Sequence, residues 1–184
     1  MDTLYYKTFY EKLTPKFLAA FNSLREGKPM LRQTLGAHIA VIPKEGKDPT
    51  LCTSYRPISL LNVDLKIFSK ILANRLITYI PSLIHPDQVG FTPGREGREN
   101  TQRVLSTIYL SQLYQNPLVL VSTDAEKAFD RVDWGFLRAI LQHIGLGEGM
   151  QNWITSLYSC PTARVKINDV MSDPFPIRKG TRQG

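Results

Sequence analysis

Four consecutive apolar residues, Leu118 to Val121, constrain the fold of this chain more than any other feature. Pro117 precedes the run, and Ser122-Thr123-Asp124 follows it. A continuous aliphatic and β-branched run bounded by a proline is typical of a strand that is buried on both faces. Helical periodicity is found before and after it, at about 99–115 and from about 133. The run therefore predicts a mixed α/β (α+β) fold with its centre near Asp124.

Other periodic patterns predict the remaining elements. In the clearest helix, Leu65, Phe68, Leu72 and Leu76 recur at three- and four-residue spacing. The predicted helices are 4–25 (in two pieces, the second beginning at Thr14-Pro15), 63–80, about 99–115, from about 133, and about 148–159. The predicted strands are 37–44, 56–61 and 163–167, the last turning at Asn168-Asp169. Three prolines and three glycines in 81–97 predict a structured loop and exclude a helix.

The composition predicts a folded, basic protein. Hydrophobic residues make up 42% of the 184 residues, which excludes a wholly disordered chain. Lys and Arg number 23 against 16 Asp and Glu, so the formal charge is +7. That charge favours a polyanionic partner, either nucleic acid or an anionic membrane surface. A basic surface that is merely solvated remains the alternative.

The cysteines and the apolar segments predict an intracellular chain. Cys52 and Cys160 have no C-x-x-C partner and suit reduced thiols better than a disulfide or a zinc site. No apolar stretch is long enough to span a membrane, and the first residues do not resemble a signal peptide. We therefore expect a location in the nucleus and/or cytoplasm and no membrane partner. The sequence leaves the oligomeric state open.

Asp124 is the first candidate for chemistry, because it follows the predicted buried strand. In α/β folds, ligand sites lie beyond the ends of such strands. A single carboxylate binds Mg²⁺ only together with waters, phosphates or other acids. In the alternative interpretation Asp124 caps the next helix, and Asp130 and Asp133 are ordinary surface or capping acids.

Basic residues are the second group of candidates. Lys44 and Arg56 flank a predicted exposed loop, and an arginine fork with a lysine charge suits a triphosphate. An ordinary basic loop is the alternative.

Gln183 has a side-chain amide that could form hydrogen bonds with a sugar or with the edge of a base. The pairs Lys66/Lys70 and Arg164/Lys166 predict weak, salt-dependent binding to phosphates. His38, His85 and His143 share no metal-ligand spacing and are interpreted as structural.

The order of several motifs carries a resemblance to a known family. The motifs are AHIAVIPK (37–44), SYRPISLLN (54–62), KILANRL (70–76), HPDQVGF (85–91) with Gly94-Arg95, DAEKAFD (124–130) and GTRQG (180–184). Together they closely resemble the reverse transcriptases of long interspersed elements, the non-LTR retrotransposons. The resemblance covers essentially the whole chain.

This resemblance implies an RNA-directed DNA polymerase that binds an RNA template, a DNA primer and a dNTP. The implied architecture is an incomplete right-hand polymerase fold, with helical fingers and the first half of a palm sheet. Residues 1–36 would form an N-terminal helical segment, 37–116 the fingers and 117–184 a partial palm. The implied cofactor is Mg²⁺, with two ions in the complete enzyme.

The resemblance also implies roles for single residues. Asp124 corresponds to the palm aspartate that binds both metal ions, and the backbone carbonyl of Ala125 assists one of them. Lys44 and Arg56 correspond to cations on the triphosphate, and Gln183 to a contact with the nucleotide sugar. Phe129 corresponds to the aromatic gate that excludes a 2′-hydroxyl. The implied nucleic-acid contacts are Lys66, Lys70, Arg95, Arg164 and Lys166.

The chain departs from the family pattern in its carboxylates. The family's palm has two further adjacent aspartates in a hairpin, whereas no two aspartates are adjacent in this sequence. Because two of the three metal-binding carboxylates are missing, we expect the 184 residues alone not to polymerise. A non-catalytic nucleic-acid-binding module and a retroelement relic without function are the alternatives.

Overall fold

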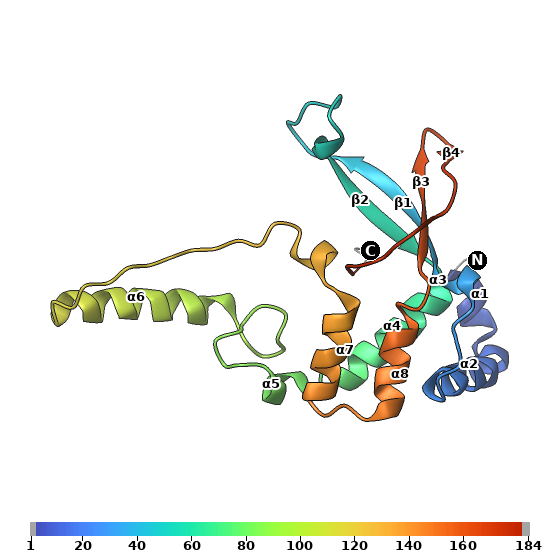
Figure 1. Cartoon of the computed structure of the whole chain (residues 1–184), viewed down its shortest axis with the longest axis horizontal. Coiled ribbons are helices and arrows are strands. Elements are labelled where there is room, and N and C mark those ends of the chain that lie inside the picture. The colour runs from blue at the N-terminus through green and yellow to red at the C-terminus, as the bar shows by residue number, and fades with distance from the viewer. Residues whose placement is uncertain (1–2, 182–184) are drawn as a thin grey trace. The chain divides into compact units, whose positions relative to one another are not determined.

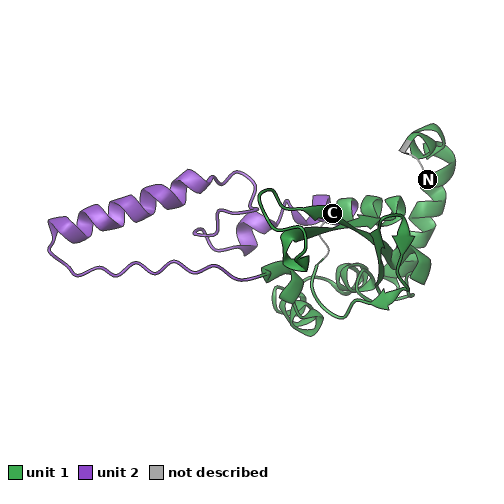
Figure 2. Ribbon diagram, turned by 90° about the horizontal axis from the view of Figure 1, so that it is seen from above, with its two compact units in different colours: residues 1–70, 127–184 green, residues 71–126 purple. Residues whose placement is uncertain are grey.

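A computed structural model describes residues 3–181 of the chain (Figure 1). The chain divides into two compact units (Figure 2). The larger unit combines residues 1–70 and 127–184, and the smaller unit is 71–126. The predicted mixed α/β class is confirmed, because the larger unit contains a sheet together with helices. The division into fingers and palm is a functional one and stays a prediction.

The sheet of the larger unit has the order β2-β1-β3-β4, and β5 also pairs with β3. Strand β1 (Gly36–Pro43) is antiparallel to β2 (Tyr55–Leu61) and parallel to β3 (Thr162–Ile167). The short strands β4 (Val170–Met171) and β5 (Phe175–Pro176) are antiparallel to β3. These strands confirm the three short strand predictions. Asn168 and Asp169 both have positive φ, as a tight turn between β3 and β4 requires.

Helices at both ends of the sequence build the core of the larger unit. They are α1 (Thr3–Thr8), α2 (Tyr10–Arg25), α3 (Arg32–Leu35), α7 (Trp134–His143) and α8 (Glu148–Ser156). The indole Nε1 of Trp153 on α8 donates to the carbonyl oxygen of Phe21 on α2 at 2.6 Å. Phe21 stacks on Phe68 with ring centroids 4.6 Å apart, and the Phe68 side chain is fully buried. Segments 132 residues apart in sequence are thereby joined through apolar burial and one partly buried hydrogen bond.

The smaller unit contains the end of α4 (Val63–Leu76), α5 (Ile80–Leu83), a long loop and α6 (Gly97–Leu113). Glu96 and Glu99 form a capping box at the start of α6. The guanidinium of Arg95 donates to four backbone carbonyl oxygens, those of His85, Gln88, Pro81 and Ile84, at 2.6–3.2 Å. One side chain therefore links four backbone carbonyl groups of this segment. No described helix has the length and the apolar composition needed to cross a membrane.

The prediction of a buried strand at 118–123 is wrong. Residues 116–125 have no regular secondary structure, and the side chains of Val119 and Val121 are 84% and 80% exposed. None of the strands within residues 3–181 pairs with this segment. An apolar run becomes a strand only where a neighbouring strand takes its backbone hydrogen bonds, and the described chain has no such neighbour.

Three predicted helix boundaries also need correction. The break in the first helix lies at Phe9, and Pro15 lies inside α2. The helix predicted over 63–80 ends at Leu76. A one-turn helix, α5, occurs in the loop from which helix was excluded, with Pro81 in its first turn. A proline is tolerated there because the first N–H groups of a helix have no intrahelical partner.

Candidate active site

A tight turn follows Asp124 and leads into α7. Lys127 has a left-handed backbone conformation, and its carbonyl oxygen accepts from the N–H groups of Asp130 and Arg131 at 3.0 and 3.2 Å. The Asp133 carboxylate then accepts from the backbone N–H of Phe136 at 2.8 Å and caps α7. The interpretation of Asp133 as a capping acid is thereby confirmed. The side chain of Phe129 is half exposed within this turn.

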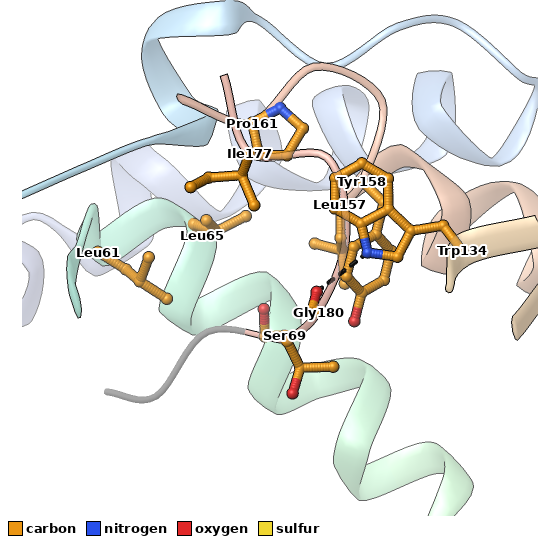
Figure 3. A pocket seen from close by; sticks show the side chains of 10 residues that line it. Leu61, Leu65, Ser69, Trp134, Leu157, Tyr158, Pro161, Ile177 and Gly180 are labelled. Carbon is orange, nitrogen blue, oxygen red and sulfur yellow. Dashed lines mark hydrogen bonds between the residues drawn. The ribbon is translucent and has the colours of Figure 1, made fainter. Parts of the chain in front are cut away.

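The segment before Gln183 is hydrogen-bonded to this turn. The N–H of Gly180 donates to the carbonyl oxygen of Val132, and the N–H of Thr181 donates to that of Phe129, both at 2.8 Å. The indole Nε1 of Trp134 donates to the carbonyl oxygen of Gly180 at 3.0 Å (Figure 3). The tertiary structure thus joins the DAEKAFD and GTRQG motifs, about 50 residues apart in sequence. Gln183 itself lies outside the described residues.

Two cavities adjoin this junction. The first, of about 240 Å³, is mostly apolar and lies between α4 and the Trp134 ring, which contacts Tyr158 at a centroid distance of 5.3 Å (Figure 3). The second, of about 170 Å³, lies between the sheet and the 177–181 segment, and Ser59, Asp130 and Lys179 line part of it. Residues of the junction therefore line one cavity together with α4 and another together with β1 and β2.

Lys44 and Arg56 lie at the same end of the β1–β2 hairpin. Arg56 pairs in register with Ile42, and its side chain is exposed. Lys44 follows the last residue of β1; its Nζ donates to the carbonyl oxygen of Thr53 at 2.8 Å, and its N–H donates to that of Ser54 at 2.7 Å. The register places the two predicted triphosphate cations at the same end of the hairpin, where Lys44 is also hydrogen-bonded to the loop between the strands.

The loop of this hairpin is ordered by Asp48. Its carboxylate accepts from the hydroxyl and the backbone N–H of Thr50, at 2.7 and 2.8 Å. These two hydrogen bonds hold the pKa of Asp48 below its ordinary value, because they favour the charged carboxylate. An ionised Asp48 therefore keeps the loop between Lys44 and Arg56 in its turn conformation.

Asp124 and Ala125 belong to the smaller unit, and both are exposed. Within residues 3–181, the Asp124 carboxylate forms no hydrogen bond or ion pair, and no three His, Cys, Asp or Glu side chains come together as a metal site. A carboxylate and a carbonyl oxygen fit two positions around Mg²⁺, a cation that completes its shell with water and phosphate oxygens.

The predicted nucleic-acid contacts lie on three elements. Lys66 and Lys70 are exposed and one turn apart on α4, and Arg164 and Lys166 are exposed at alternate positions of β3. Lys166 forms an ion pair of 2.8 Å with Asp169. Arg95 donates to the four loop carbonyls described above and supports that loop.

Sequence reasoning missed the contribution of Trp134 and Gly180 to the junction. Nothing in the local pattern near Trp134 indicates a long-range hydrogen-bond partner. The one available signal is the glycine itself, because Gly180 has a φ of +84°, a conformation that favours glycine.

Comparison with known proteins gives consistent matches. Residues 42–184 match the family model described as reverse transcriptase (RNA-dependent DNA polymerase). The chain is 31% identical over 180 residues to the transposon TX1 uncharacterized 149 kDa protein of Xenopus laevis, a match covering 98% of this chain and 14% of that protein. It is 39% identical over 113 residues to the probable RNA-directed DNA polymerase from transposon X-element of Drosophila melanogaster, covering 59% of this chain and 11% of that protein.

A further Drosophila melanogaster relative is the RNA-directed DNA polymerase from mobile element jockey, 34% identical over 120 residues, which are 64% of this chain and 13% of that protein. The chain thus spans a small part of the length of these relatives. Proteins of this family act on nucleic acid and dNTPs and use divalent metal ions. Because the family model covers most of the chain and the relatives are proteins of mobile elements, the chain belongs to the reverse transcriptases of non-LTR retrotransposons.

Proposed function

We propose that this chain supplies the fingers and the first part of the palm of an RNA-directed DNA polymerase. The observation that carries the proposal is the junction of two family motifs. Thr181 and Gly180 are hydrogen-bonded to the turn that contains Phe129, and this junction lies against the sheet whose hairpin carries Arg56. Arg56, Phe129 and Thr181 thus belong to the larger unit, whereas Asp124 and Ala125 belong to the smaller unit.

In this proposal the fingers cations bind the triphosphate of the incoming nucleotide. Arg56 offers a planar fork to two phosphate oxygens, and Lys44 adds a second positive charge beside it. Both residues lie at one end of the hairpin. Their charges offset the negative charge that spreads over the phosphates during transfer.

Asp124 and Ala125 are the residues that would hold Mg²⁺, through a carboxylate and a backbone carbonyl oxygen. Two bound Mg²⁺ ions would activate the primer 3′-hydroxyl and stabilise the leaving pyrophosphate. The Phe129 ring would occupy the space beside the nucleotide sugar and exclude a 2′-hydroxyl, and Gln183 would contact that sugar. Lys66, Lys70, Arg95, Arg164 and Lys166 are proposed contacts to the template and primer.

A second candidate function is nucleic-acid binding without catalysis. It is favoured by the +7 formal charge of the chain. In this alternative the basic faces bind phosphates, and Asp124 has no catalytic role. Binding would then weaken with salt, with a slope of log K on log salt of about −2 to −3.5 for three to five phosphates on single strands.

Primer extension on an RNA template separates the two functions. We expect the 184-residue chain to incorporate no nucleotide with Mg²⁺, since one carboxylate does not hold two metal ions. A complete reverse transcriptase domain that carries this chain should extend the primer, and Asp124→Ala should abolish extension there. Asp133→Ala removes a capping carboxylate and serves as the matched control, which should keep activity.

Two variants of the same complete domain test the nucleotide contacts. Phe129→Ala should admit ribonucleotides, because removal of the ring opens space for the 2′-hydroxyl. Arg56→Ala should raise the KM for dNTP with a smaller effect on kcat, through loss of a charge-assisted contact of about 1.5–3 kcal/mol. An active domain indifferent to Asp124→Ala would overturn the site assignment.

A further inference from the structure

The N-terminal helices α1 and α2 (Figure 1) line a groove that no role assigned above uses. It has a volume of about 290 Å³ and is lined by Tyr5, Tyr6, Leu13, Lys16 and Phe17 from these helices and by Asp64 from α4. All of these residues belong to the larger unit. The groove therefore combines aromatic rings, an aliphatic floor and one lysine.

Two partly exposed aromatic rings are in contact beside this groove, and one of them, Tyr5, lines it. The rings of Tyr5 and Phe9 have centroids 5.0 Å apart, and the two side chains are 39% and 41% exposed. Tyr5 also contacts the ring of Tyr6 edge-on at 5.6 Å. Tyr5 and Phe9 therefore offer two adjacent, partly exposed aromatic faces beside the groove.

The Tyr6 side chain next to these rings is connected to the core. The Tyr6 hydroxyl donates to the Asp64 carboxylate at 2.6 Å, and the Tyr6 ring stacks on Phe17, which stacks on Phe21. Phe21 in turn stacks on the fully buried Phe68. A continuous aromatic column thus runs from Tyr6 to the core, and Tyr5 contacts its outer end. A partner that binds to such a preorganised surface loses little conformational entropy in the protein.

The charge beside the groove is positive. Lys12 and Lys16 are exposed and one helical turn apart on α2, so they lie on the same side of the helix. Within the described part of the chain neither ammonium forms an ion pair or a hydrogen bond. The carboxylate that lines the groove, that of Asp64, accepts a hydrogen bond from the Tyr6 hydroxyl. The surface therefore offers two available cations next to flat aromatic faces.

We propose that this groove binds single-stranded nucleic acid. A base stacks on the Tyr5 and Phe9 rings, and the neighbouring phosphates lie near Lys12 and Lys16. Aromatic side chains with adjacent cations bind single strands in this way, because every base has a flat face and every nucleotide carries a charge. The inference rests on the proposed function, since it assumes a chain that binds nucleic acid, but it adds a contact outside the residues assigned there.

Fluorescence anisotropy with the 184-residue chain tests the stacking contact. The probes are a labelled 12-nucleotide oligo(dA) and an abasic oligonucleotide of the same length, which keeps the phosphates and lacks the bases. Tyr5→Leu should weaken binding of oligo(dA) about 5- to 30-fold and leave binding of the abasic probe unchanged. Tyr5→Phe keeps the ring and should bind like the original chain. Tyr10→Leu removes an exposed tyrosine that does not line the groove and should also have no effect.

A salt titration tests the phosphate contact. Lys16→Ala should weaken binding of both probes and reduce the salt slope by about 0.7. Lys28→Ala is the matched control, because Lys28 already forms an ion pair with Glu26 at 3.2 Å. The Lys28→Ala variant should have the same slope of log K on log salt as the original chain. Thermal unfolding midpoints within about 2 °C of the original chain verify that each variant is folded.

The outcomes separate this inference from the proposed function. If the chain binds oligo(dA) and neither Tyr5→Leu nor Lys16→Ala weakens binding, the groove proposal is overturned while nucleic-acid binding stands. If Tyr5→Leu weakens both probes equally, or Tyr10→Leu acts as strongly, the stacking contact is overturned. If the unaltered chain binds neither probe at low salt, the groove proposal and the proposed nucleic-acid binding both fail.

Discussion

Gly180 lies so close to the backbone of Asp130 that a β-carbon at position 180 would be 2.6 Å from the Asp130 carbonyl oxygen and 2.8 Å from its Cα. The φ of Gly180 is +84°, and its carbonyl oxygen accepts from the Trp134 indole at 3.0 Å. Close approach and backbone conformation both require glycine at this position. The contact holds the start of the GTRQG motif against the turn that contains Phe129.

Gly180→Ala should therefore lower the free energy of unfolding by about 2–4 kcal/mol, because an added methyl meets backbone atoms that cannot move aside. Urea unfolding measures the change. Gly46→Ala is the matched control: Gly46 also has a positive φ, of +68°, but a β-carbon there has no neighbour within 4 Å. The Gly46→Ala substitution should lower the free energy of unfolding by only about 1 kcal/mol. Equal losses in the two variants would contradict the tight junction.

The Tyr6 hydroxyl makes stability depend on alkaline pH. Burial, and secondly the hydrogen bond to Asp64, raise the pKa of Tyr6 from 10.0 to about 12. The folded state therefore favours the neutral phenol. Its contribution to stability is complete below pH 10 and is lost as the pH rises from 10 through about 12.

Tyr6→Phe should lower stability at neutral pH by about 1 kcal/mol, through loss of the bond to the Asp64 carboxylate. It should also flatten the decline in stability between pH 10 and about pH 12, measured by urea unfolding. Tyr10→Phe removes a hydroxyl that bonds only the neighbouring Glu11 and should keep the original decline. If the stability of the Tyr6→Phe protein declines at alkaline pH as steeply as that of the original chain, Tyr6 is not the cause of that decline.

Arg95 should control the order of the loop between α5 and α6. Arg95→Ala removes the hydrogen bonds to His85, Gln88, Pro81 and Ile84, so amides of residues 84 and 88 should exchange with solvent faster. We expect a local loss of about 2 kcal/mol in protection by hydrogen exchange. Arg98→Ala removes an exposed ion pair with Glu96 and should change protection by less than about 0.5 kcal/mol.

The backbone amide hydrogens of the apolar segment 118–121 should exchange rapidly with solvent, and the segment should promote association between copies of the chain. No backbone amide in residues 117–125 donates a hydrogen bond within the described chain, so exchange should be much faster there than in β1. Val119→Lys should reduce aggregation, measured by light scattering, without lowering the free energy of unfolding, since the side chain is 84% exposed. Strong amide protection at 118–121 would show instead that the segment pairs as a strand.

Local patterns in the sequence determined the elements whose hydrogen bonds or apolar faces are satisfied nearby. The alternation at 163–167 predicts β3, and the proline-bounded runs before Lys44 and after Tyr55 predict the β1–β2 hairpin. The four-residue spacing from Leu65 to Leu76 predicts α4, because one face of that helix must be buried. The order of the motifs determined the family, and with it the expected roles of Asp124 and Phe129.

The tertiary structure decided what depends on distant neighbours. Leu118 to Val121 has the pattern of a strand, yet no other described segment offers it backbone partners, and it remains exposed. Conversely, Gly180 meets Asp130 and Trp134 only because the chain folds back across about 50 residues. The aromatic column from Tyr6 to Phe68 likewise joins helices that are separate in sequence. Propensity and periodicity act over a few residues, whereas long-range pairing depends on which distant segments the folded chain brings together.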